Sequence, residues 1–438
     1  MTWPAFPAAF QLITLGLFLG FLVLGFGQRI PDGVPPKLYA KSNLVNLAIW
    51  GIWWPSMIWV AVLFGRLWCS ICPLELVSSL GERLGRAASL SRLDLPRWFR
   101  DGWFLLLAYA AIQMLVAGVS MHRTPAYTSI FLLVMLLLAL LTGVLMRHRA
   151  FCRGFCPVGM LLKTYGRGGM LAVRAAHPLD PDDRRRVARS CPSLLNPPRL
   201  ESGKDCLLCG ACVKASEHGR MRILLRPPYD AGDARDREAP WPQTLFVLLV
   251  SGFVTYELTT NWDQAQEWFL WVPRTAATWL GLDPHNGWIA GLFKLFVWPL
   301  AFWSLLGGLT MASGGARSMG EAWRRLALPL AVVVSAGHMS KGIAKLATWS
   351  GYLPGALEEP LAARTARAYA GGSLARPPAL LSWPVLSACA SLLLLAGMAF
   401  ALREIRLEGG DGARGRRPAI VLTGTLFLAI ALRWGLWT

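Results

Sequence analysis

Long runs of apolar residues alternate with short polar or basic segments along most of this chain. Roughly 20 helical residues cross the hydrocarbon core of a bilayer, and nine runs approach or exceed that length. They cover 7–27, 43–65, 102–118, 128–146, 241–260, 287–311, 327–347, 380–402 and 418–437. The third run is the shortest, and Gln113 interrupts it. This pattern predicts an all-α polytopic membrane protein with about nine transmembrane helices.

The longest polar segment, residues 147–240, is rich in Arg, Pro and Gly and has little periodicity of either strand or helix. Such a composition is typical of a segment that supplies ligands rather than of an independent hydrophobic core. The sequence therefore predicts three parts: a four-helix membrane region at 1–146, this polar segment at 147–240, and a five-helix membrane region at 241–438.

Basic residues outnumber acidic ones, 44 to 25, which gives a net charge of +19. If the N-terminus is cytoplasmic, the predicted cytoplasmic loops 66–101, 147–240, 312–326 and 403–417 carry 6, 18, 3 and 5 Lys and Arg. The four opposite loops carry 3, 1, 1 and 3. Because cytoplasmic loops of membrane proteins are enriched in Lys and Arg, the charge predicts a multi-pass protein of the inner (cytoplasmic) membrane, in contact with lipid. It gives no reason to expect nucleic acid as a partner.

Eight of the nine cysteines lie between Cys69 and Cys212, next to basic residues. The run Cys206-x2-Cys209-x2-Cys212 has the spacing with which three thiolates wrap a four-iron cluster, the fourth coming from a distant Cys. A Cys-Pro would ordinarily follow after three intervening residues, but that position is Ser216. Cys191-Pro192 supplies the missing element, so we expect a first cluster at a set of four cysteines: Cys191, Cys206, Cys209 and Cys212. Residues 147–240 then become a small ferredoxin-like cluster-binding segment on the cytoplasmic side.

The other four clustered cysteines follow the second and fourth apolar runs, as Cys69-x2-Cys72-Pro73 and Cys152-x3-Cys156-Pro157. Neighbouring helices can bring these two pairs together, which predicts a second four-iron cluster. The pairing between clusters stays open, because ferredoxin-type folds exchange their Cys-Pro ligand. Structural zinc also accepts C-x2-C pairs, and free or disulfide-bonded cysteines are the other alternative.

These motifs resemble the NosR/NapH type of membrane polyferredoxin, a family of 4Fe-4S binding membrane proteins. The resemblance rests on the Cys69–Cys72 and Cys152–Cys156 pairs with their prolines and on the ferredoxin-like run after them, and it covers about residues 43–215. It implies clusters that face the cytoplasm and pass electrons from a quinol pool or another donor to a respiratory reductase system. Two residues separate the first cysteine pair, where three are more typical of the family.

The seventh apolar run places His338, Lys341 and Lys345 on one helix face, and ionisable groups inside a membrane by default mark a function. We expect His338 and Lys341 to form a quinol or proton site. A haem ligand and simple interhelical hydrogen bonding, with Lys345 reaching the interface, are alternatives. Glu257 and Lys294 are expected to form an ion pair between two helices.

The sequence favours a membrane electron-transfer protein with two 4Fe-4S clusters, which relays electrons between a quinol or a redox protein donor and respiratory partner subunits. Such a subunit needs no catalytic residue of its own, so whether the chain is an enzyme stays open. Two other classes remain: an oxidoreductase that itself oxidises quinol at His338, with quinone as a further cofactor, and a reductive maturation factor for another metalloenzyme.

Overall fold

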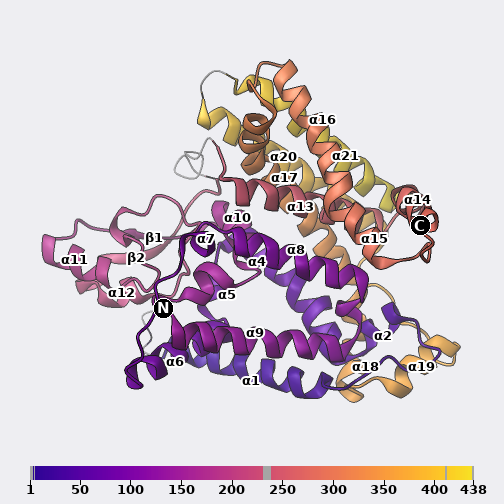
Figure 1. The fold of residues 1–438 in the computed structure, drawn as a ribbon, viewed down its shortest axis with the longest axis horizontal. Coiled ribbons are helices and arrows are strands. Elements are labelled where there is room, and N and C mark those ends of the chain that lie inside the picture. Colours follow the sequence, from indigo (N-terminus) through magenta and orange to yellow (C-terminus); the bar gives the residue numbers. More distant parts are fainter. Residues whose placement is uncertain (1–2, 4, 230–237, 410–411, 437–438) are drawn as a thin grey trace. The chain divides into compact units, whose positions relative to one another are not determined.

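The computed structural model describes residues 3, 5–229, 238–409 and 412–436, and the chain in it is mostly helical (Figure 1). Within these residues, seven helical segments are long and apolar enough to cross a membrane, which supports a multi-pass membrane protein. They are Ala8–Gly25, Leu44–Phe64, Pro125–Leu145, Gly287–Ala312, Met319–Glu358, Trp383–Glu408 and Arg414–Leu436.

The remaining two apolar runs are also helical. Residues 102–118 form α8 (Trp103–Gly118), which is apolar but has only 16 residues. Residues 241–260 form α13 (Trp241–Thr259), with 19 residues. Helix formation is therefore confirmed for every predicted run, within a few residues at each end, while the count of nine transmembrane helices stays a prediction.

The chain folds into two compact units, each built from segments that are distant in the sequence. Unit 1 comprises Met1–Leu22, Val60–Ala108 and Phe131–Arg235, and unit 2 comprises Val23–Trp59, Tyr109–Ile130 and Asp236–Thr438. All eight clustered cysteines belong to unit 1, whereas His338 and Lys341 belong to unit 2. The predicted division at residues 146 and 240 is a different partition and stays a prediction.

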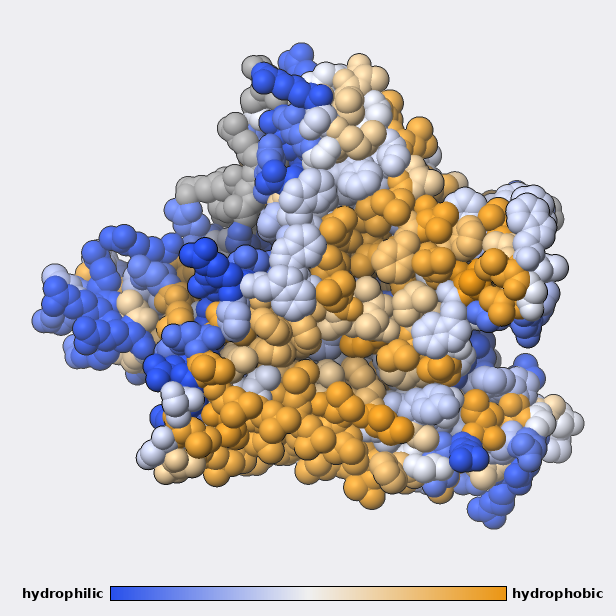
Figure 2. All heavy atoms as spheres, viewed as in Figure 1, coloured by the Kyte–Doolittle hydropathy of each residue, from blue (hydrophilic) through white to orange (hydrophobic). Residues whose placement is uncertain are grey.

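In unit 1, helix α6 (Pro73–Ala87) packs directly against α9 (Pro125–Leu145). A Cβ at Gly81 would lie 2.6 Å from the carbonyl oxygen of Leu140, and one at Gly143 would lie 2.3 Å from that of Ser78. Glycines therefore allow the two backbones to touch, as small residues do in membrane helix pairs. Figure 2 shows apolar side chains over the exposed face of α1 (Ala8–Gly25) and α9, as expected for a surface in contact with lipid.

The polar segment of unit 1 has more regular structure than its sequence indicates. Strands β1 (Leu171–Ala175) and β2 (Met221–Leu225) pair antiparallel, with Leu171 opposite Leu225. Helices α11 (Pro181–Arg189) and α12 (Ala211–Ala215) lie between them in the sequence. A small core holds these elements together, formed by Val173, Leu179, Val187, Leu208, Cys212 and Met221. This part of the chain is hydrophilic on its surface (Figure 2); part of its predicted span, 230–237, lies outside the described residues.

In unit 2, helix α17 (Met319–Trp349) is almost completely enclosed by its neighbours, among them α13, α20 (Trp383–Glu408) and α21 (Arg417–Leu436). A Cβ at Gly397 of α20 would lie 2.6 Å from the side chain of Ala336, so these two helices approach closely. The central position of α17 buries His338, which is 4% exposed.

Candidate iron–sulfur centre

The first Cys-Pro motif begins a helix. Cys72 is the N-cap residue of α6, and Pro73 occupies its first turn, where the missing N–H costs no hydrogen bond. The backbone N–H groups of Leu74 and Glu75 donate to the Cys72 sulfur. A helix N-terminus stabilises negative charge, so a thiolate that formed here on binding a cation or cluster would have two backbone donors already in place.

The second Cys-Pro motif repeats this geometry. Cys152 lies in a single π-helical turn, η3 (Phe151–Phe155), and Cys156 directly follows that turn. The backbone N–H of Val158 donates to the Cys156 sulfur, and that of Gly159, the first residue of α10 (Gly159–Tyr165), donates to the Cys156 carbonyl (2.8 Å) and lies close to the same sulfur. The sequence similarity between the two motifs thus has a common physical basis, a cysteine thiol at the beginning of a helix.

Contacts outside the cysteines hold the two motifs together. Glu75 of α6 is 4% exposed, and its carboxylate lies 2.8 Å from the guanidinium of Arg149, three residues before Cys152. The Gln11 amide of α1 donates to Glu75 and, over 3.1 Å, to the carbonyl of Ser70. Together with the glycine contact between α6 and α9, this buried network fixes the spacing of the two motifs.

The four thiols of these motifs share one environment, in which Cys69 is buried and Cys72, Cys152 and Cys156 are half-buried. Burial, followed by the charges of Cys69 and Cys156, raises the pKa of Cys72. Burial, Glu75 and the other three thiols likewise raise the pKa of Cys152. Buried thiols that repel each other's negative charge are poor thiolates unless a cation or cluster binds them. The donor set therefore fits a group that four thiolates can hold.

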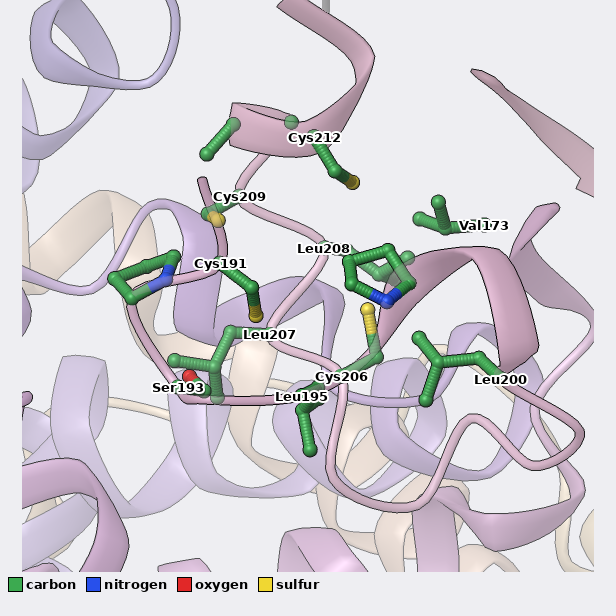
Figure 3. A pocket seen from close by; sticks show the side chains of 14 residues that line it. Val173, Cys191, Ser193, Leu195, Leu200, Cys206, Leu207, Leu208, Cys209 and Cys212 are labelled. Atoms are coloured by element: carbon green, nitrogen blue, oxygen red, sulfur yellow. The ribbon is translucent and has the colours of Figure 1, made fainter. Parts of the chain in front are cut away.

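The other four cysteines, Cys191, Cys206, Cys209 and Cys212, line one cavity. Figure 3 shows their sulfur atoms around a common space, with apolar side chains such as Leu195 and Leu200 beside them. The Cys206–Cys212 run curves because Leu208 (φ 52°) and Gly210 (φ 76°) adopt left-handed conformations. The N–H of Leu208 donates to the Cys206 sulfur, and burial raises the pKa of that thiol to about 11. A thiolate ring with backbone donors is the environment that a four-iron cluster needs.

Arg66 lies between the two cysteine sets and is 7% exposed. Its guanidinium hydrogen-bonds Cys69, and its positive charge acts on Cys152 and Cys156 of one set and on Cys206 of the other. Asp205 is close to this guanidinium and pairs with Lys163 at 3.2 Å. The single buried guanidinium of Arg66 is therefore close to cysteines of both sets, and the two sets are neighbours.

Cys191, Cys206, Cys209 and Cys212 line one cavity, and Cys69, Cys72, Cys152 and Cys156 are close enough for their charges to interact. Within the described residues, no three His, Cys, Asp or Glu side chains lie as close as a single metal ion requires, and the assignment of the eight cysteines to two clusters stays a prediction. Sequence reasoning missed Arg66 and Glu75. A signal for Arg66 was available, because it immediately precedes the Trp-containing Cys69 motif. Nothing local distinguishes Glu75, whose role depends on Arg149 far along the chain.

His338 and Lys341 lie away from the cysteines in sequence and in a different unit, where they line a cavity of about 560 Å³. The His338 ring is near the rings of Phe253 (5.5 Å) and Trp54 (6.5 Å). Lys341 Nζ donates to Thr260 Oγ1 (2.6 Å) and Asn261 Oδ1 (2.9 Å). Both residues face one cavity, and their role as a quinol or proton site stays a prediction.

Comparison with known proteins agrees with the cysteine chemistry. Residues 47–90 and 128–174 match a protein family described as a 4Fe-4S binding domain. These ranges include Cys69, Cys72, Cys152 and Cys156, and they end before the Cys191–Cys212 set. No curated protein and no solved structure matches the chain. The match supports an iron–sulfur protein with a role in electron transfer, while the more specific resemblance to the NosR/NapH type stays a prediction.

Proposed function

We propose that this chain is a membrane electron-transfer protein with two 4Fe-4S clusters. One cluster is held by Cys69, Cys72, Cys152 and Cys156, and the other by Cys191, Cys206, Cys209 and Cys212. The observation that carries the proposal is the pair of largely enclosed four-thiol sets, with the buried Arg66 close to both. A cluster so held accepts and releases single electrons without a bound substrate.

The arrangement supports a relay more strongly than a catalytic site. Backbone N–H groups donate to the cysteine sulfurs in both sets, and such hydrogen bonds, together with burial, set the potential of a cluster. An electron entering at one set would leave through the neighbouring set toward a partner. We propose a quinol or a redox protein as the donor and a respiratory subunit as the acceptor, with the clusters on the cytoplasmic side of the inner membrane.

The experiment that tests this function is metal analysis combined with electron paramagnetic resonance of the purified full-length protein. We expect about eight irons per chain, as two four-iron clusters require. Cys209→Ser should remove one reduced-cluster signal and about half of the iron, and Cys72→Ser should remove the other. Cys389→Ala is the matched control, because this cysteine lies in α20, outside both sets.

Two results would contradict the proposal. Zinc at one ion per site with no iron would make the sites structural. Four irons per chain, with Cys209→Ser indistinguishable from the unchanged protein, would leave a single cluster at the site that the family match covers.

A further inference from the structure

Unit 2 contains a second candidate site, the cavity of about 560 Å³ that includes His338. The elements that line it include α2 (Pro36–Ser42), the helical segment Leu44–Phe64, α8, η2 (Met121–Arg123), α13, α14 (Asp263–Trp279), η7 (Phe293–Val297) and α17. This volume is within the range of about 300–1,000 Å³ that is typical of small-molecule sites. None of the clustered cysteines lines it.

The lining is strongly cationic. Three of its lysines, Lys294, Lys341 and Lys345, come from the apolar helices. The other cations are Lys37, Lys41, Arg123 and Arg274, and Glu257 is the single carboxylate among the described lining residues. Arg274 is paired with Glu267. In the part of the chain that the structure describes, no carboxylate lies within 4.0 Å of the other six cations.

Neutral groups contact these cations without cancelling their charge. Lys294 Nζ lies over the rings of Tyr256 (4.8 Å) and Phe253 (5.4 Å), and Lys345 Nζ lies over Trp349 (4.6 Å). No nitrogen–oxygen contact within 4.0 Å joins Lys294 and Glu257 in the described residues, so the expected ion pair is not formed there, although the Glu257 charge acts on Lys294. A ring face offers a cation only about 0.5–2 kcal/mol, too little to offset several like charges in a partly buried space.

Mutual repulsion affects the cations at the cavity edge. Burial, followed by the positive charges of Lys37, Arg376 and Lys345, lowers the pKa of Lys41 to about 8. Membrane insertion enriches the cytoplasmic loops in Lys and Arg, and the predicted outer loops have only eight basic residues in total. Insertion therefore does not account for this cluster. Four of those eight line this one cavity. These cations repel one another, and four of them belong to loops in which Lys and Arg are otherwise scarce. Such a cluster indicates a site that a negatively charged ligand completes.

We propose that this cavity binds a multivalent oxyanion, in which phosphate or carboxylate groups are attached to a partly apolar body. Because six such cations and only one carboxylate are among the described lining residues, a ligand that balances their charge must carry more than one negative charge. The indoles of Trp50, Trp54 and Trp349 provide apolar walls for the remainder of the ligand. The buried Asn261 Nδ2, which has no hydrogen-bond partner in the described structure, is a further donor for an oxyanion. A neutral quinol would satisfy these walls but would add no negative charge to the one that Glu257 supplies.

The ligand can come from the aqueous phase or from the membrane, since phosphate groups occur in soluble metabolites and in anionic lipids. Full-length protein in neutral detergent is titrated with pyrophosphate and with citrate while tryptophan fluorescence and thermal unfolding are followed. The same protein in phosphatidylcholine nanodiscs, with and without cardiolipin, provides the lipid arm. We expect saturable binding and a raised unfolding temperature with the soluble anions if the source is aqueous, or with cardiolipin alone if it is lipid.

Charge variants locate the binding. Lys345→Met keeps the length and apolar stem of the side chain and should weaken the affinity about tenfold, the scale of one lost partly screened charge pair. Arg367→Gln removes one charge from an exposed position of unit 2 outside the cavity and should leave the affinity unchanged. If Lys345→Met does not fold, Lys37→Gln at the exposed rim should show a smaller loss of affinity in the same direction.

Three results would overturn the proposal. The first is the absence of saturable binding for pyrophosphate, citrate and cardiolipin. The second is equal affinity in the Lys345→Met, Lys37→Gln and Arg367→Gln proteins, which would place the anion elsewhere, for example on the basic loops. The third is binding of a neutral quinone analogue without any competition from the anions, which would assign the cavity to a quinol headgroup. Iron content is measured in parallel, so failure of the cluster proposal is recognised separately.

Discussion

Single residues tune the candidate iron–sulfur centre without being ligands. The Arg66 guanidinium hydrogen-bonds Cys69 and acts electrostatically on Cys152, Cys156 and Cys206. Reduction adds a negative charge to a cluster, and a nearby buried cation stabilises that charge. Arg66 should therefore raise the reduction potential of both clusters and bring their potentials close together.

Replacing Arg66 tests this role. Arg66→Gln should lower the midpoint potential of both clusters by tens of millivolts, because the favourable charge is lost in a poorly screened environment. Arg66→Lys should restore part of the potential, since it keeps the charge but not the planar donor geometry. Redox titration followed by electron paramagnetic resonance measures both values.

Arg86→Gln is the matched control, since the Arg86 side chain is 60% exposed and pairs with Glu82. Unchanged potentials in Arg66→Gln, with full iron content, would show that Arg66 only fills space. A shift of one cluster alone would mean that the guanidinium serves a single set.

At the scale of elements, the starts of helices carry much of the chemistry. Cys72 precedes α6 and Cys156 precedes the turn into α10, so each places a thiol where free backbone N–H groups collect. Helix α11 uses the same principle for stability: the Asp180 carboxylate accepts from the N–H of Asp183 (2.7 Å). Asp183 in turn accepts from Arg186 and from the N–H of Glu217.

The α11 contacts predict an acid-sensitive element. The N–H of Asp183, then Arg220, lowers the pKa of Asp180, and Arg186 above all lowers the pKa of Asp183. A carboxyl with a lowered folded pKa stabilises the fold while it is ionised, so this stability is complete above the ordinary value of 3.8 and is lost as the pH falls through the folded pKa. Hydrogen exchange of the α11 amides should therefore accelerate in that acidic range more than the exchange of α17.

Asp180→Asn separates charge from capping, because asparagine also caps helices well. This variant should keep α11 at neutral pH and lose part of the acid sensitivity. Asp182→Asn, at an exposed neighbouring position, is the control and should behave like the unchanged protein. Equal acid sensitivity in both variants would attribute the effect to other groups.

At the scale of the whole molecule, each functional candidate belongs to one compact unit: the cysteine sets to unit 1 and the cationic cavity to unit 2. Neither unit is a continuous stretch of chain. Helix pairs that are distant in the sequence must therefore pack before either site exists. Loss of iron and loss of anion binding can consequently be measured as separate effects of mutation.

Sidedness is the prediction that belongs to this scale. A reporter inserted after Pro192 should behave as cytoplasmic, and one inserted near Asp283 should behave as periplasmic, because basic residues are concentrated in the loops on the Pro192 side. Paired alkaline phosphatase and fluorescent protein fusions measure this directly. A cytoplasmic signal from the Asp283 fusion would overturn the predicted topology and the cytoplasmic placement of the clusters.

The sequence by itself determined the features that depend on neighbours along the chain. Apolar runs predicted all seven segments that are long and apolar enough to cross a membrane, since hydrophobic length is a local property, but not the amphipathic helices α6 and α14, which lie in predicted loops. The spacing in Cys206-x2-Cys209-x2-Cys212 indicated cluster chemistry. It also indicated that the Cys69 and Cys152 motifs could share a site. The short strands β1 and β2 were not predicted, because five-residue segments stabilised by distant pairing leave little periodicity.

Tertiary structure alone decided the features that depend on which distant segments meet. Glu75 and Arg149 are ordinary charged residues until α6 and α9 bring them to 2.8 Å. Lys37, Arg123 and Lys345 look like separate surface or snorkelling cations until unit 2 turns them toward one cavity. The physical reason is that charge interactions fall off with distance in space and not along the chain, so their meaning is set only by the packing of helices.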